Sequence, residues 1–311
     1  FKLQMGKKNI IILLSGPTAS GKSSLAIKLA QHYNGEIINA DSMQIYKEIS
    51  ILTSKPSLKD IKIAKHHLYG FTSVKKKFST GHWLKLVIKK IENLWQKELT
   101  PIIVGGTGLY FKALTEGLVQ IPDIPINITA DIRKLHKELG QETFFKKLTE
   151  LDPLAKKFVL PSDAQRSMRV YEVKKFTNKS LFELIKETKP SFNKDVFKKI
   201  FIDTPKELLH KNINNRVEKM FNDGAVEEVE NFFKMKVYRE LSSNKIIGIK
   251  EIKSYLNGKI PITETKELIK QKTRQYAKRQ FTWSRGHMKS WNKIYSLNIN
   301  DLYKKALNKI S

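Results

Sequence analysis

Three short apolar runs, each followed by a polar or glycine-rich turn, lie in the first third of the chain. They occur in the stretches NIIILL, GEIINADS and TPIIVGGTG, which begin at Asn9, Gly35 and Thr100. Continuous runs rich in β-branched residues are typical of strands buried on both faces of a parallel sheet. Helical patterns lie between them, so residues 1–118 predict an α/β fold with helices on both faces of a parallel sheet. Ligands of such sheets bind at the carboxyl ends of the strands, where these turns fall.

The pattern changes after Leu118. A proline-spaced segment, IPDIPINI, leads into stretches with helical periodicity, so we expect residues 119–199 to form a helical insertion. One more apolar run, in KKIFID, then precedes a helical pattern that breaks at Asp223-Gly224. Residues 200–311 are therefore expected to return to the first domain and to end in basic helices.

The charge of the chain narrows the choice of partner. Its 311 residues carry 58 Lys plus Arg against 30 Asp plus Glu, a formal net charge of +28. Such an excess favours a polyanionic partner, nucleic acid above all, although lysine-rich usage can also follow from genomic base composition. The chain has no cysteine, which excludes disulfides, thiolate zinc sites and a cysteine nucleophile. With no apolar run of membrane-spanning length and no cleavage site, we expect a soluble, cytoplasmic protein. We also expect a monomer.

The first run leads into GPTASGKS, which fits the phosphate-loop pattern G-x-x-x-x-G-K-[ST] between a predicted strand and a predicted helix. In this pattern backbone N–H groups and the positive end of the helix hold phosphate oxygens, while the lysine adds a charge and the last hydroxyl ligates Mg²⁺. The pattern does not distinguish a triphosphate from a diphosphate. The predicted phosphate-binding residues are Gly16, Pro17, Thr18, Ala19, Ser20, Gly21, Lys22 and Ser23, with Ser23 as the magnesium ligand.

The second run ends at Asp41, in NADSMQIY. A carboxylate at this strand end lies near the phosphate loop if the first two strands are close neighbours in the sheet. It could then ligate magnesium, contact a ribose or act as a general base. Equally, Asp41 or Ser42 could cap a helix formed by MQIYKEI.

The third run ends in the turn GGTG, residues 105–108. Adjacent glycines allow the backbone to approach a ligand closely, and Thr107 supplies a hydroxyl. The alternative interpretation is a tight turn that binds nothing.

Two other sites are weaker candidates. Asp203, in KIFIDT, resembles a magnesium-binding Asp at a strand end, but it also precedes Thr204-Pro205 and suits a helix entry. The pair His66-His67 has no third metal-type ligand nearby in the sequence, so we expect no metal there.

Near the end of the chain, KTRQYAKRQFTWSRGHMKSWNK interleaves basic and aromatic residues. At helical spacing Arg274, Lys278 and Arg285 can share one face, and Tyr276, Arg279 and Trp283 another. The basic residues are expected to bind RNA phosphates, and the aromatic residues to anchor the helix in the core rather than to stack on bases.

Taken together, several segments resemble one family in order and approximate spacing. They are GPTASGKSSLA, GEIINADSMQIYKEISILTSKPS, HHL, PIIVGGTGLYFKAL, SDAQRSMRVYEV, GIKEI and TRQYAKRQFTWSR. By these segments the chain resembles the tRNA dimethylallyltransferases, also called adenosine-37 isopentenyltransferases. The resemblance runs from about Ile11 to Arg285. The fold that this resemblance implies is a P-loop NTPase-like parallel sheet with an inserted all-helical tRNA-binding domain.

The resemblance implies transfer of a dimethylallyl group from dimethylallyl diphosphate to the exocyclic amine of the adenosine beside the tRNA anticodon, with Mg²⁺ as cofactor. The phosphate loop, with Arg216, then binds the diphosphate. By the same resemblance Asp41 is the general base, and Thr107 lies beside the reacting carbon. The residues expected to contact the anticodon stem-loop are Asp41, Ser42, Met43, Gln44, Thr107, Arg133, Ser162, Asp163, Ala164, Gln165, Arg166, Arg169, Arg274, Lys278, Arg279 and Arg285.

The chain departs from the family pattern at three places. Ile249 stands where an aromatic residue is usual, FSTGHW replaces a Tyr-Ser-Ala type segment, and Asn178 stands where glycine is common. These departures bear on substrate fit more than on the reaction. Two other functions compete with the transferase: a P-loop kinase of a small metabolite or nucleoside, and an RNA-binding protein without catalytic activity.

Overall fold

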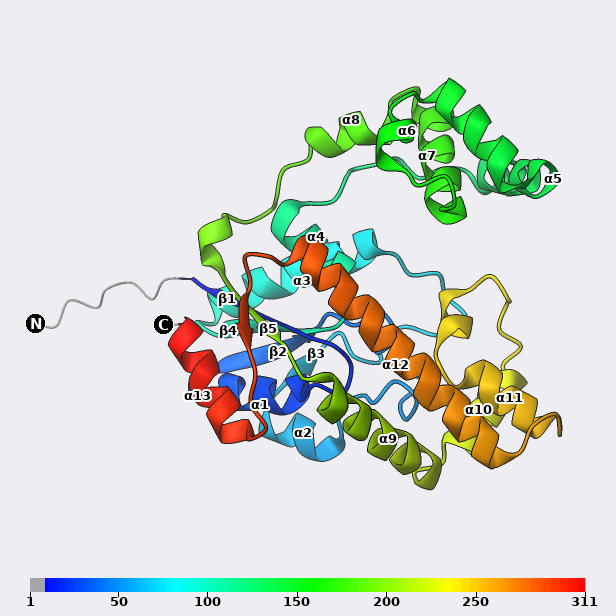
Figure 1. Ribbon diagram of the computed structural model, residues 1–311. Helices are drawn as coiled ribbons and strands as arrows, with labels where there is room; N and C mark the ends of the chain where they lie inside the picture. Colours follow the sequence, from blue (N-terminus) through cyan, green and yellow to red (C-terminus); the bar gives the residue numbers. More distant parts are fainter. Residues whose placement is uncertain (1–8, 311) are drawn as a thin grey trace, which may run out of the picture. The chain divides into compact units, whose positions relative to one another are not determined.

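The computed structural model describes residues 9–310 (Figure 1). Within this part of the chain the sheet has six strands in the order β3-β2-β4-β1-β5-β6, and every neighbouring pair is parallel. The predicted parallel α/β fold is confirmed. The strands are β1 (Ile11–Ser15), β2 (Gly35–Asn39), β3 (His66–His67), β4 (Thr100–Gly105), β5 (Phe197–Ile202) and β6 (Asn292–Ile294).

The order of the strands brings three sequence motifs to one edge of the sheet. Strand β4 lies between β1 and β2, so the first two strands are not neighbours. In the pairing registers Ser15 is opposite Gly105, and Asn39 is opposite Val104. Because all three strands run in the same direction, the segments that follow them leave the sheet side by side.

Helices pack against the sheet on both faces. Alternate residues of the strands point to opposite faces. Ile12 and Leu14 of β1 pack in one buried cluster with residues of α1 and α13, whereas Phe201 of β5 contacts Phe281 of α12. The helices of this part are α1 (Lys22–His32), α2 (Leu58–Ile63), α3 (Thr80–Gln96), α4 (Gly108–Glu116), α9 (Lys206–Asn222), α10 (Ala225–Lys234), α11 (Ile249–Leu256), α12 (Ile262–His287) and α13 (Ile299–Ile310).

A second buried cluster joins the segment after β2 to the late helices. Ile45, Tyr46 and Ile49 are buried together with residues of α9, α10, α11 and α12. The carboxylate of Glu228, on α10, accepts three backbone N–H groups from residues 50–52 of this segment. The stretch that carries Asp41 is therefore held by packing and by hydrogen bonds at its far end.

The chain divides into two compact units, residues 1–115 with 192–311, and residues 116–191. The second unit contains α5 (Ile126–Leu151), α6 (Ala155–Phe158), α7 (Ala164–Thr177) and α8 (Leu181–Lys186). It has a buried cluster of its own, which includes Phe144 of α5 and Val170 of α7. Inside this unit the hydroxyl of Ser180 donates to Asp152 Oδ2 at 2.8 Å, and both side chains are buried.

The observed boundaries of the helical unit differ from the expected 119–199. Strand β5 already begins at Phe197, where it pairs with Ile11, so these residues belong to the sheet. Two lysines, Lys198 and Lys199, interrupt the apolar pattern at this point, which hid the start of the strand. None of the helices described between residues 9 and 310 combines the length and the apolar character needed to cross a bilayer.

Candidate functional site

The phosphate-loop motif forms the turn between β1 and α1. Helix α1 begins at Lys22, preceded by Gly21 in the left-handed region at φ 86°. Ala19 is also left-handed, at φ 64°, a conformation that non-glycine residues seldom adopt. The Lys22 ammonium donates to the carbonyl oxygens of Gly16, at 2.9 Å, and Pro17, at 2.6 Å. This combination of a tight turn, a helix amino end and a lysine is suited to hold an anion.

Side chains from two distant helices fix the conformation of this loop. Arg216 of α9 donates from Nη1 to the hydroxyl oxygen of Thr18 at 2.6 Å. Asn212, on the same helix, donates to the carbonyl oxygen of Ala19 at 3.1 Å. Gln280 of α12 accepts the backbone N–H of Thr18 through Oε1 at 2.8 Å. The loop is thus held on two sides by residues that follow it by about two hundred positions or more.

Asp41 lies in an irregular segment, not at the start of a helix. No helix forms within residues 40–57, so the helix-capping interpretation of Asp41 is wrong. Asn39 directs the backbone here, because its Oδ1 accepts the Asp41 N–H and its Nδ2 donates to the carbonyl oxygens of Asp41 and Leu68. The carboxylate itself accepts the N–H of Met43 at 2.8 Å. Local hydrogen bonds hold Asp41 in one orientation.

Thr107 ties the end of β4 to the segment that contains Asp41. Its hydroxyl oxygen accepts the N–H of Ser42 at 3.0 Å, and its own N–H donates to the carbonyl oxygen of Ala40 at 3.2 Å. A Cβ on Gly105 would lie 2.1 Å from that same carbonyl oxygen, so only glycine fits. This glycine therefore serves an approach of two protein segments, whereas the sequence suggested an approach to a ligand.

The charges of Asp41 and Lys22 influence each other. Burial raises the pKa of Asp41 above its ordinary value, opposed by the hydrogen bond from Met43 and by the charge of Lys22. Burial, and then the charge of Arg216, lowers the pKa of Lys22 to about 7, whereas Asp41 acts to raise it. Although β1 and β2 are not neighbours, Asp41 does lie within electrostatic reach of the phosphate loop. A carboxylate with a raised pKa is a stronger base near neutral pH.

Three tyrosines lie within the electrostatic field of Asp41. Burial raises the pKa of Tyr69, Tyr110 and Tyr276, and in each case the charge of Asp41 raises it further. Their hydroxyls stay protonated and are available as donors at physiological pH. Tyr110 is held by stacking on Trp83, with ring centroids 4.3 Å apart. Tyr69 and Tyr110 were not singled out in the sequence, and Tyr276 was expected to serve as a core anchor.

Other sequence candidates lie elsewhere or are already bonded. Asp203 is exposed and donates its backbone N–H to Ile294, as expected of a residue between a strand and a helix. His66 bonds to the carbonyl oxygen of Ala64, and His67 to the carboxylate of Glu36. Between residues 9 and 310 there is no group of three or more His, Cys, Asp or Glu side chains placed to hold a metal ion.

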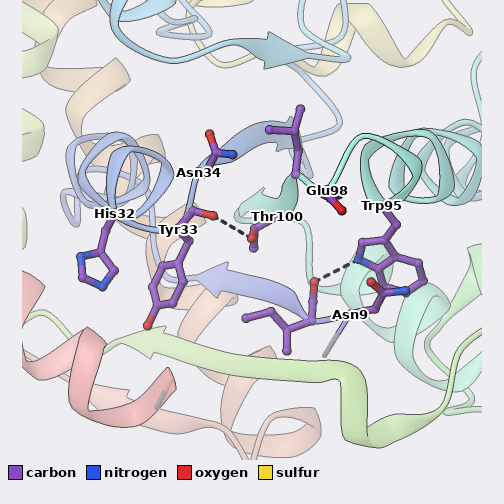
Figure 2. Close-up of a pocket in the computed structure, with 9 residues that line it drawn as sticks. Asn9, His32, Tyr33, Asn34, Trp95, Glu98 and Thr100 are labelled. Carbon is purple, nitrogen blue, oxygen red and sulfur yellow. Dashed lines mark hydrogen bonds between the residues drawn. The ribbon is translucent and has the colours of Figure 1, made fainter. Parts of the chain in front are cut away.

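A hollow of about 530 Å³ opens at the opposite edge of the sheet (Figure 2). Asn9, His32, Trp95 and Thr100 line it, at the amino ends of strands β1 and β4 and the carboxyl ends of α1 and α3. The Trp95 indole donates to the carbonyl oxygen of Ile10 at 3.2 Å, and Figure 2 shows the Trp95 side chain at this hollow. None of the predicted phosphate-binding or catalytic residues lines this hollow, so it is separate from the candidate site.

Comparison with known proteins agrees with the motifs. A family model described as IPP transferase matches residues 44–287. The chain is 52% identical over 307 residues to the tRNA dimethylallyltransferase of Pelagibacter ubique, covering 99% of this chain and 98% of that protein. It is 43% identical over 281 residues to the tRNA dimethylallyltransferase of Rickettsia massiliae, covering 89% and 77%. The chain belongs to this IPP transferase family.

Solved structures of the family share the fold. A eukaryotic dimethylallyltransferase captured acting on tRNA superposes with a TM-score of 0.82 at 26% identity, covering 97% of this chain and 77% of that one. A full-length tRNA isopentenylpyrophosphate transferase of Bacillus halodurans gives a TM-score of 0.69 at 27% identity, with 97% of both chains covered. Membership of the family confirms the resemblance and favours a transferase over a kinase or a non-catalytic RNA-binding protein.

Within this family member, the basic residues of α12 fall into two groups. Arg274 is half-buried and donates from Nη2 to Asn214 Oδ1 of α9 at 2.7 Å. Lys278, Arg279 and Arg285 are exposed and available to a solvent-borne partner. Arg274 thus joins two helices, and the predicted shared face of Arg274 with Lys278 and Arg285 includes one cation that is already bonded.

The predicted tRNA contacts of the helical unit lie at the start of α7 and on α5. Asp163 caps α7 by accepting the N–H of Arg166 at 3.0 Å. Arg166 and Arg169 are exposed, and Arg169 donates to the carboxylate of Glu172 at 3.3 Å. Arg133 is exposed on α5. Ser162 and Gln165 are exposed too, whereas Asp163 and Ala164 are half-buried.

Two predicted tRNA contacts have structural roles in the segment after β2. Gln44 donates through Nε2 to the carbonyl oxygens of Thr53 and Ser54. Met43 is half-buried and packs against the cluster that joins this segment to α9–α12. Both side chains shape the segment that carries Asp41.

Two of the three departures from the family pattern, Asn178 and Ile249, fit the structure. Asn178 ends α7 in the left-handed region at φ 58°, where asparagine is the best replacement for glycine. Ile249 begins α11, is 1% exposed and lies in the same buried cluster as Ile45. Asn178 therefore suits a helix end that favours glycine, and Ile249 places an apolar side chain in a buried position.

Proposed function

We propose that this protein transfers the dimethylallyl group of dimethylallyl diphosphate to the exocyclic amine of the adenosine next to the anticodon of tRNA, releasing diphosphate. The observation that carries the proposal is the position of Asp41. It lies within the field of Lys22 and Arg216, and its segment is bonded to Thr107. A base, an anion-binding loop and a hydroxyl at one edge of the sheet are what such a transfer requires.

In this proposal the phosphate loop holds the leaving group. The bond between the allylic carbon and the diphosphate oxygen breaks, and its electron pair goes to the diphosphate. Lys22, the loop N–H groups and Arg216 stabilise the charge that develops there. The Arg216 guanidinium already lies against the loop, 2.6 Å from the Thr18 hydroxyl.

Asp41 acts on the other reactant. Aromatic amines are weak nucleophiles, so a carboxylate that accepts the proton as the nitrogen attacks lowers the barrier. Burial raises the pKa of Asp41, which increases its basicity. The target adenosine has to leave its stack to reach this carboxylate, a requirement met in other base-modifying enzymes by extruding the nucleotide.

The residues present fit a magnesium ion that is held mainly by phosphate oxygens. Ser23 is exposed in the first turn of α1, beside Lys22, and is the protein ligand we assign. No carboxylate cluster in the described chain competes for this role, and Mg²⁺ is commonly bound by one or two protein groups together with substrate phosphates. When bound, the ion would neutralise charge on the diphosphate.

We further propose that the exposed cations of α12 and of the helical unit bind the tRNA backbone, that the protein acts as a monomer, and that it works in the cytoplasm, where its tRNA substrates are made. The exposed positions of Lys278, Arg285, Arg166 and Arg169 support the first of these statements.

The test is an assay of the transfer. The protein is incubated with Mg²⁺, dimethylallyl diphosphate and an unmodified tRNA with adenosine beside its anticodon, and the nucleosides are analysed by mass spectrometry. We expect adenosine to gain one dimethylallyl group, and Asp41→Asn to lower kcat by about 10²- to 10⁴-fold. Asp203→Asn removes an exposed carboxylate at another strand end and should leave kcat unchanged. Absence of the modified nucleoside, or equal rates for Asp41→Asn and wild type, would refute the proposal.

A further inference from the structure

A single buried amide joins the two halves of the candidate site. Gln280 of α12 is 8% exposed. Its Oε1 accepts the N–H of Thr18 in the phosphate loop at 2.8 Å, and its Nε2 donates to the carbonyl oxygen of Gly106 at 3.1 Å. One end of this side chain therefore touches the loop proposed to bind the donor, and the other end touches the turn that carries Thr107.

Further hydrogen bonds connect the Gly106 turn to the segment that carries Asp41, the proposed base. Thr107, the next residue, donates to Ala40 and accepts from Ser42 on either side of Asp41. From the phosphate loop to the Asp41 segment, the connection passes through Gln280 and then through the backbone of the β4 turn. Tyr276, one helical turn before Gln280 on α12, lies in the field of Asp41.

The chemistry of this position selects glutamine. The Thr18 N–H requires an acceptor and the Gly106 carbonyl requires a donor, and a primary amide supplies one of each on a rigid plane. Glutamate retains only the acceptor. Methionine has a similar shape and replaces neither bond well. The two partners also fix which way the amide faces, since the reverse orientation would lose both bonds.

The contact with Gln280 requires glycine at position 106. A Cβ at this position would lie 2.1 Å from Gln280 Nε2. Trp283 lies about one helical turn after Gln280 on α12, and a Cβ on Gly108 would lie 2.0 Å from its Nε1. Helix α12 thus docks closely on the β4 turn at two glycines. Phe281, between these contacts, packs against Phe201 of the sheet with ring centroids 6.0 Å apart.

We propose that Gln280 is a positioning residue that sets the distance between the diphosphate-binding loop and the turn that orients Thr107 and Asp41. The inference rests on the proposed function. Group transfer needs the amine nitrogen in line with the carbon whose bond to diphosphate breaks, and an error of about 1 Å can cost about a hundredfold in rate. A side chain that spans both loops controls this distance without touching either substrate.

Loss of this control has a specific chemical signature. When the amine is displaced, water can attack the same allylic carbon. The carbon–oxygen bond to diphosphate breaks, diphosphate leaves with the electron pair, and water loses a proton to give dimethylallyl alcohol. The ratio of modified tRNA to dimethylallyl alcohol therefore reports on positioning, whereas a general loss of fold lowers both products together.

The experiment compares Gln280→Glu and Gln280→Met with wild type, and uses Gln275→Met, an exposed glutamine on the same helix, as the matched control. We expect both Gln280 variants to lower kcat for tRNA modification by about 10- to 100-fold. The KM for dimethylallyl diphosphate should stay within about threefold, and the ratio of modified tRNA to alcohol should fall at least about tenfold. Gly106→Ala disturbs the same contact from the other side and should behave alike.

The outcomes separate the two hypotheses. If wild type makes no modified tRNA, the proposed function fails. If wild type is active and the Gln280→Glu variant, folded by circular dichroism, has an unchanged kcat or an unchanged product ratio, the positioning role is refuted. Should Gln280→Met fail to fold, Gln280→Glu and Gly106→Ala decide the question.

Discussion

The carboxyl edge of the sheet and the helical unit of residues 116–191 are built in opposite ways. At the sheet edge, polar groups such as Asn39, Thr107 and Gln280 are buried or half-buried and bonded to backbone atoms. In the helical unit the buried residues are mainly apolar, and cations such as Arg166 and Arg169 lie in solvent. The first arrangement fixes atoms to fractions of an ångström, as chemistry requires. The second offers charge to a large polyanion whose binding tolerates looser geometry.

The largest effect is expected when the helical unit is unfolded and the sheet edge is followed separately. Phe144 is fully buried in the helical unit, with its ring 5.2 Å from that of Tyr171. Phe144→Ala should destabilise this unit by about 3–5 kcal/mol, because it leaves a cavity in a small core. Hydrogen exchange of the full chain should show faster exchange in α5 and α7. Binding of dimethylallyl diphosphate should be retained, and its loss would show that the two regions are not separable.

A smaller effect is expected from the exposed cations. Replacing Arg166 and Arg169 together by alanine should weaken tRNA binding and reduce the slope of log affinity against log salt concentration by about 1–2. Fluorescence anisotropy over a range of salt concentrations measures the slope. Lys305→Ala on α13 removes a charge that is paired with Asp301 and serves as the control. An unchanged slope in the double variant would place the tRNA contacts elsewhere.

The smallest effect concerns protons at the phosphate loop. The pKa of Lys22 is lowered to about 7, so at pH 8 its amine is largely neutral. A bound diphosphate favours the ammonium form and raises this pKa, so binding should take up a fraction of a proton at pH 8 and less at pH 6. Calorimetry in two buffers of different ionisation enthalpy measures the uptake. The Lys22→Arg variant, whose charge does not titrate, gives the background, and an equal uptake in both proteins would contradict the assignment.

Sequence patterns predicted most strands of the sheet but few of the hydrogen bonds that join the loops following those strands. The apolar runs before Gly16, Asp41 and Gly105 became strands β1, β2 and β4, because a strand buried on both faces must be apolar throughout. Strand β5 was only partly apparent, since Lys198 and Lys199 interrupt its pattern. The two-residue strand β3 and the three-residue β6 are too short to carry a period.

The candidate site shows the same division. Lys22 and Asp41 were found because each follows a strand in a recognisable motif. Gln280 could not be predicted although it lies within TRQYAKRQFTWSR, because its neighbours suggest a basic, RNA-binding helix. Tyr69 and Tyr110 were missed because nothing local distinguishes a tyrosine near a carboxylate from one in an ordinary core.

The family, the phosphate loop, the carboxylate after the second strand and the large positive charge could all be predicted from the sequence. Motifs depend on residues close together in the chain, and net charge depends on composition alone. Only the folded structure shows that β4 separates β1 from β2, that Asp41 begins no helix, and that Gln280 reaches the phosphate loop. These facts depend on contacts between residues far apart in the chain. A buried polar side chain needs a hydrogen-bond partner, and here that partner is distant in the sequence, so the residues next to it in the chain do not identify it.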